Sequence, residues 1–64
     1  MSKHLKGEKP GWHVVTKAEG KPVSGAWKSP YDAKVHLTHK GPAQHVAVNW
    51  NGAAVTDVIE GVAA

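Results

Sequence analysis

The chain contains no cysteine, no arginine and no phenylalanine, and it has no long run of apolar residues. Without cysteine there can be neither a disulfide nor a thiolate zinc site, which excludes disulfide-stapled secreted scaffolds and zinc ribbons. Without arginine the chain lacks the side chain that forms bidentate hydrogen bonds with phosphate and guanine, which argues against sequence-specific recognition of DNA. No apolar run approaches the length of a membrane span, so we expect no membrane partner.

The chain is also short, at 64 residues. A domain of this size buries about 60% of the surface that its unfolded chain exposes, so its core is small and leaves little room for a deep pocket. Valine is the commonest bulky residue, with nine copies against two leucines and one isoleucine, which favours a core built around a β-sheet. The stretch from Met1 to Lys6 lacks the apolar run of a signal peptide, and we therefore expect a cytoplasmic protein.

Positive charge is concentrated in the first two thirds of the chain. Residues 1–40 hold eight lysines against three acidic residues, a balance of +5, whereas residues 41–64 hold only Asp57 and Glu60, a balance of −2. Such a field attracts either phosphate backbones or an acidic protein surface.

The composition divides the chain into three parts. Residues 1–11 combine lysine, glycine and proline with almost no apolar content, so we expect a flexible basic N-terminal arm that does not pack. A single domain is expected over residues 12–60, followed by a frayed tail at 61–64.

The first part of this domain is predicted to be a β-hairpin. Residues 12–17 are aromatic and β-branched, and the Glu19-Gly20 pair that follows is a turn signal. Residues 23–28 then alternate as a second strand, in which Gly25 marks a bulge or a close approach of another group.

A helix is predicted next, with clear signals at both ends. Ser29 is placed as the N-cap, Pro30 occupies the first helical position, and Asp32 puts negative charge near the positive end of the helix. Gly41 is expected to end the helix after about three turns. The apolar positions form no single stripe, and Ala33 with Leu37 is the preferred core pair.

A second hairpin is predicted from strands at 44–50 and 53–59, joined by a two-residue turn at Asn51-Gly52. Strict alternation would put Asp57 on the apolar face, which indicates a bulge or a register shifted by one residue. An alternative remains open for residues 53–62, because four apolar residues there also fall at helical spacing: Val55, Val58, Ile59 and Val62. The predicted fold is therefore α+β, in the order β-β-α-β-β, with about four antiparallel strands and one helix packed on one face.

Several short motifs resemble a family of short bacterial and phage-borne proteins that is defined only as a domain of unknown function. The resemblance covers residues 12–59 and is carried by Trp12-His13-Val14, Gly20, Ala26-Trp27-Lys28-Ser29, Asp32-Ala33, His45-Val46-Ala47-Val48 and Gly52. The chain departs from the family at Trp27, where an aliphatic residue or phenylalanine is usual, and in lacking a long alanine-rich helix. The resemblance implies the hairpin, helix, hairpin fold and implies no activity, cofactor or catalytic residue.

Five histidines raise the question of a metal site. His36 and His39 are spaced to face one side of the helix, and His45 could approach from the next strand. No cysteine or well-placed carboxylate completes the set, so we expect ordinary surface histidines and no metal.

Catalytic motifs are missing. None of the three serines, Ser2, Ser24 and Ser29, lies in a Gly-x-Ser-x-Gly elbow, and the glycines show neither dinucleotide-binding nor Walker spacing. We therefore expect no enzyme activity, no cofactor and no small-molecule substrate.

The remaining feature is the combination of lysines with tryptophans. Tryptophan occurs on three predicted strands, at Trp12, Trp27 and Trp50, which are either core residues or stacking surfaces for bases. The candidate binding residues lie in the arm and around the first hairpin: Lys3, Lys6, Lys9, Lys17, Lys21, Trp27 and Lys28.

Two functions follow from these features. The preferred one is a non-enzymatic binding module, such as a bacterial or phage accessory factor, that docks on a larger protein or self-associates through a free sheet edge. The alternative is a nucleic-acid-binding protein that uses the lysines and an exposed tryptophan.

Overall fold

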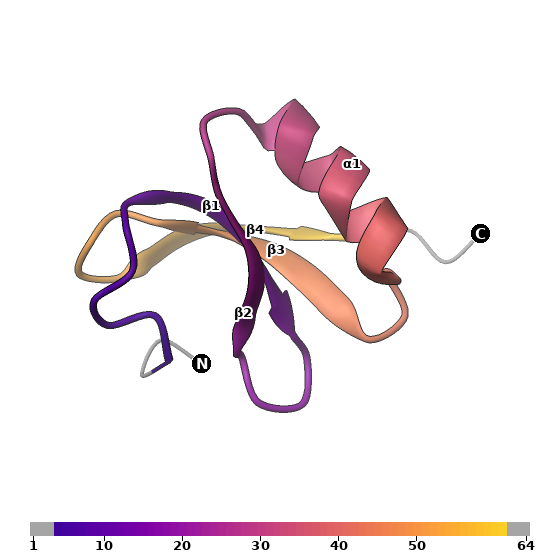
Figure 1. Ribbon diagram of the computed structural model, residues 1–64, viewed down its shortest axis with the longest axis horizontal. Coiled ribbons are helices and arrows are strands. Elements are labelled where there is room, and N and C mark those ends of the chain that lie inside the picture. Colours follow the sequence, from indigo (N-terminus) through magenta and orange to yellow (C-terminus); the bar gives the residue numbers. More distant parts are fainter. Residues whose placement is uncertain (1–3, 62–64) are drawn as a thin grey trace.

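The computed structural model describes residues 4–61 and shows the predicted α+β fold (Figure 1). One antiparallel sheet has the strand order β2-β1-β3-β4, and the helix packs against β1, β2 and β3. The elements are β1 (Gly11–Thr16), β2 (Pro22–Trp27), α1 (Pro30–Lys40), β3 (His45–Trp50) and β4 (Val55–Glu60).

The helix begins and ends at the predicted residues. The Ser29 hydroxyl accepts a hydrogen bond of 3.2 Å from the Asp32 amide, which satisfies one of the free N–H groups of the first turn. At the other end Gly41 adopts φ 111° and its N–H donates to the Leu37 carbonyl at 3.0 Å. Ala33 and Leu37 are buried, which confirms them as the core pair of this helix.

The first hairpin is irregular along β2. Its pairing with β1 shifts register twice between Trp12 and Val15. The prediction of a close approach at Gly25 is confirmed: this residue has φ 147°, and a Cβ there would collide with the His13 ring and lie 3.0 Å from the Trp12 carbonyl oxygen. The missing side chain thus makes room for a buried histidine.

The turn of the second hairpin differs from the prediction. A two-residue type I′ turn needs positive φ at both Asn51 and Gly52, but no non-glycine residue in the described range has positive φ. Instead a four-residue loop is closed by a 3.1 Å bond from the Asn51 amide to the Ala54 carbonyl. The Asn51 side-chain oxygen accepts from the amides of Ala53 and Ala54, each at 2.8 Å, and this capping stabilises the longer loop. The predicted strand start at residue 53 is therefore wrong.

The last segment is a strand with a bulge, which resolves the position of Asp57. Trp50 pairs with Val55 and Asn49 pairs with Asp57, so Thr56 is the extra residue. The extra residue breaks the alternation that would have put Asp57 on the same face as Val55, and Asp57 is exposed. The predicted bulge is confirmed, and the helical alternative is excluded for the described part of this segment.

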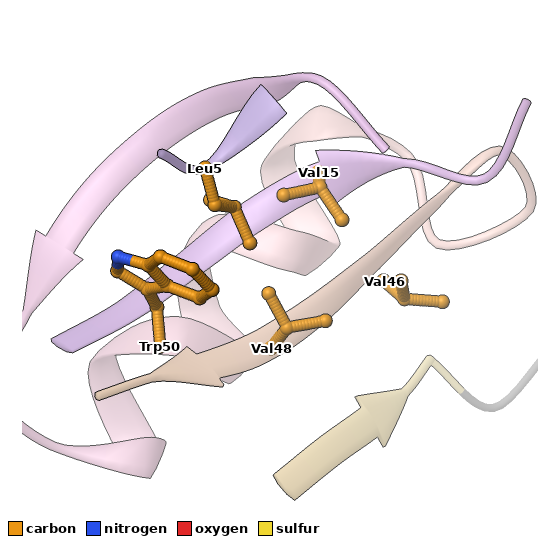
Figure 2. Close-up of a cluster of buried hydrophobic side chains, with 5 residues drawn as sticks. All are labelled: Leu5, Val15, Val46, Val48 and Trp50. Carbon is orange, nitrogen blue, oxygen red and sulfur yellow. The ribbon is translucent and has the colours of Figure 1, made fainter. Parts of the chain in front are cut away.

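Both faces of the sheet are covered. On the helix side, Trp12, Val14 and Ala47 pack with Ala33 and Leu37 of α1. On the opposite side, a second cluster is formed by Leu5, Val15, Val46, Val48 and Trp50 (Figure 2).

For the described residues 4–11, the second cluster corrects the prediction that the N-terminal segment, residues 1–11, does not pack. Leu5 is fully buried, and the Trp50 indole N–H donates to the Glu8 carbonyl at 3.2 Å. The His13 ring contacts the Lys9 carbonyl at 2.7 Å, and because a carbonyl only accepts, His13 Nε2 carries the proton. The contacts that hold this segment on the sheet come from one leucine side chain and two backbone carbonyls. Such contacts leave no periodic pattern in the sequence from which they could be predicted. The mobility predicted for the arm stays a prediction.

Replacing Leu5 by alanine should destabilise the protein by about 2 kcal/mol or more, because it removes a fully buried side chain from the second cluster. Urea unfolding measures the change. Lys6→Ala, at the exposed neighbouring position, is the control and should change stability by less than about 0.5 kcal/mol. Equal unfolding midpoints for the two variants would show that Leu5 is not packed.

Gly25→Ala should cost about 1–3 kcal/mol more than Gly7→Ala. Both glycines have positive φ, but a Cβ at Gly7 meets no atom within 4 Å, whereas a Cβ at Gly25 meets His13. The pair of variants therefore separates steric crowding from backbone strain in thermal or urea unfolding. A similar loss in both would argue against a tight contact between Gly25 and His13.

Candidate functional site

A groove of about 630 Å³ lies at the end of the sheet where β1 and β4 begin and β2 and β3 end. Residues from the N-terminal segment and from β1, β2 and β3 contribute to it. We call it the Trp–Lys groove after its side chains, and its walls include all three tryptophans, two lysines and two asparagines: Trp12, Trp27, Trp50, Lys9, Lys28, Asn49 and Asn51.

The three tryptophans contribute unequally. Trp12 and Trp50 are 9% and 2% exposed, so they are core residues that expose little surface to the groove. Trp27 packs against the helix-side cluster but is only partly buried. Of the two possibilities left open for the tryptophans, the core therefore holds for Trp12 and Trp50, and Trp27 alone of the three keeps an accessible ring.

The Trp27 ring is held in place on two sides. Its indole N–H donates to the Ser24 hydroxyl at 3.1 Å, and its ring stacks on His36 of α1 with a centroid distance of 3.7 Å and an interplanar angle of 7°. The hydrogen bond to Ser24 depends on the bulge in β2. In a regular strand, residues three apart point to opposite faces, whereas the bulge brings Ser24 and Trp27 to the same face. A ligand at the groove would thus meet a preorganised ring.

The predicted lysines divide into two groups. Lys9 and Lys28 line the Trp–Lys groove, because the residue after β2 lies beside the start of β1 in an antiparallel hairpin. Lys17 and Lys21 flank the turn at the opposite end of this hairpin, where Lys21 lies 3.6 Å from the Glu19 carboxylate.

The two remaining lysines of the predicted set belong to the N-terminal segment. Lys6 is exposed there, and Lys3 lies outside the described residues. The structure therefore brings together Lys9, Trp27 and Lys28. Asn49 and Asn51, which were not predicted as site residues, are their neighbours. The exposed position of Asn51 after a strand was the available signal for one of them.

The histidines are engaged in other contacts. His36 stacks on Trp27, its centroid lies 6.4 Å from that of His39, and His45 Nδ1 is 3.0 Å from the Gly41 carbonyl. Within residues 4–61 no three histidine or acidic side chains gather closely enough to hold a metal ion.

The outer edge of β4 is a second candidate surface. β4 pairs with β3 alone in the described part of the chain, so one row of its backbone N–H and C=O groups is directed away from the sheet. Val58 is 53% exposed, and Asp57 and Glu60 are exposed acidic residues of the same strand. Neither forms an ion pair within the described range.

Family models, curated proteins and solved structures give no match to this chain. Among residues 4–61 no helix has the length and apolar character needed to cross a membrane. The function is therefore inferred from the Trp–Lys groove and the β4 edge.

Acrylamide should quench mainly the fluorescence of Trp27, because it is the most accessible of the three indoles. Trp27→Phe should remove most of the quenchable emission, whereas Trp50→Phe should leave the quenching constant of the remaining emission largely unchanged or higher. If Trp27→Phe leaves the quenching constant unchanged, Trp27 is not the accessible ring.

Proposed function

We propose that this protein is a non-enzymatic binding module that docks on a larger protein by adding an extended segment of that partner to β4. The observation that supports this proposal is that β4 is a six-residue edge strand whose outer side has no partner among the described residues. Main-chain hydrogen bonds supply affinity in such strand addition, and alternate side chains supply specificity. We expect this docking to occur in the cytoplasm, without a cofactor or a small-molecule substrate.

β4 is better suited to strand addition than the opposite edge. β2 begins with a proline, contains Gly25, and shifts register twice against its neighbour. Such irregularities are the means by which proteins protect an edge from pairing. β4 has one bulge, at Thr56, and its pairing is regular from Asp57 to Glu60.

The chemistry of β4 favours a partner strand with alternating apolar and basic residues. Val58 pairs with Val48, which places it on the sheet face opposite α1, and its exposed surface would be covered by an apolar residue of the partner. Asp57 lies on the other face of the strand, so lysine or arginine next to that apolar residue would be complementary. Glu60 lies on the face of Val58 and brings the charge of the strand to −2, with no lysine.

The same charge disfavours a second copy as the partner. Two β4 strands side by side would bring four carboxylates to one seam, and the register that places Asp57 opposite its symmetry mate is repulsive. A basic segment of a different protein has no such cost.

Replacing Val58 by lysine should abolish docking, because a cation at the edge obstructs strand addition and lowers the negative charge of β4 from −2 to −1. The probe is a synthetic peptide in which valine alternates with lysine, compared with one in which valine alternates with glutamate. Amide chemical shifts of the labelled protein should move along β4 with the lysine peptide, move less with the glutamate peptide, and stay fixed in Val58→Lys.

Val23→Lys is the matched control, because Val23 is 40% exposed on the opposite edge strand. It should bind the lysine peptide like the unmodified protein. Equal effects of the two valine substitutions, shifts confined to β2, or concentration-dependent self-association lost in Val58→Lys would each contradict docking of a basic segment on β4.

A further inference from the structure

The Trp–Lys groove carries positive charge without a compensating acid. Lys9 and Lys28 are its charged wall residues, and no aspartate or glutamate within the described range lines it. Glu8 precedes Lys9, but it borders the hollows beside His13 and Gly25 instead. An anionic occupant therefore has cations on the groove wall and no repelling charge there.

Lys9 is fixed at the groove by its own backbone. Its carbonyl accepts from His13, and the carbonyl of the preceding residue accepts from the Trp50 indole. Lys28 directly follows Trp27 at the end of β2. Both ammonium groups thus extend from anchored positions, although their side chains are exposed and free to follow a ligand.

The groove also offers one aromatic ring and an amide donor. Trp27 is partly accessible and already stacked on His36. Its side chain therefore loses little conformational entropy when a planar group binds at its accessible surface. The Asn51 side-chain oxygen is occupied by the amides of Ala53 and Ala54, which leaves its NH₂ group as the part that can donate to a ligand.

We infer that the Trp–Lys groove is a second binding site and that it takes single-stranded nucleic acid without strong sequence preference. Lysines on phosphates and a ring against a base are the two elements of such sites. An acidic peptide would use the lysines and leave the aromatic surface without a planar partner. A duplex would need an element that enters a groove of the helix, and the absence of arginine removes the main base-reading side chain.

This site is independent of the proposed docking on β4. The groove walls come from the N-terminal segment, β1, β2, β3 and the residues that follow β2 and β3, whereas the docking edge is the outer side of β4. Val58→Lys should therefore leave nucleic-acid binding unchanged. If peptide docking on β4 fails its test, nucleic-acid binding in the Trp–Lys groove can still be tested, and the reverse also holds.

The test is fluorescence anisotropy of labelled oligothymidylate and oligoadenylate, titrated with the full chain at 50 and 200 mM salt. With two phosphates neutralised on a single strand, affinity should fall about 7-fold over this range. In Lys9→Gln/Lys28→Gln this salt dependence should vanish and binding at 50 mM salt should weaken. Trp27→Leu should weaken binding of both oligonucleotides without altering their salt dependence.

Lys34→Gln/Lys40→Gln is the matched control, because it removes the same charge from exposed lysines outside the groove. It should keep both the affinity and the salt dependence to within about 2-fold. Thermal unfolding of each variant checks that the fold is retained.

Equal weakening by the two double variants would show general charge attraction and overturn the site. Absence of oligonucleotide binding at 50 mM salt, preference for duplex, or equal competition by polyglutamate and oligothymidylate would overturn it as well. Inorganic phosphate and thymidine monophosphate, used as competitors, should displace the oligonucleotide at far higher concentrations than an unlabelled strand, since each contacts only part of the groove.

Discussion

The central constraint on this fold is that β1 is buried on both of its faces. Trp12 and Val14 face the helix, whereas His13 and Val15 face the other side, and all four are buried. A chain with a single short helix can cover only one face, so the second must be covered by something else. The described residues before β1, 4–10, do this with one buried side chain, Leu5, and with carbonyls that receive hydrogen bonds from Trp50 and His13.

This double cover limits the parts of the sheet that remain accessible. With both central strands shielded, the two binding surfaces that we propose lie at the outer edge of β4 and at the open end of the sheet beside Trp27. The covering segment is also part of the second surface, because the hydrogen bonds that hold it down place Lys9 on the groove wall. Packing of the core and presentation of charge thus depend on the same few contacts.

Local signals in the sequence predicted the parts of the fold that local interactions determine. The Ser29 cap and the Gly41 end are properties of a few neighbouring residues, and the strands follow from β-branched runs. The burial of Leu5 depends on contacts with residues more than 40 positions away in the sequence, such as Val48 and Trp50. No periodic pattern in the sequence predicts these contacts. The separation of Lys28 from Lys17 follows from antiparallel pairing and could be predicted. The residues that line the groove depend also on the strand register and on the position of the bulge in β2, which the sequence does not determine.

The most direct test of this account is the proximity of Leu5 to Trp50, measured by nuclear Overhauser effects in the full chain (Figure 2). If Leu5 packs on the second face of the sheet, its methyl groups give cross-peaks to the Trp50 ring and to Val48, and the indole displaces the methyl resonances. Leu5 methyl groups at the chemical shifts of an unfolded chain, with no cross-peak to either residue, would show instead that the second face of the sheet is open.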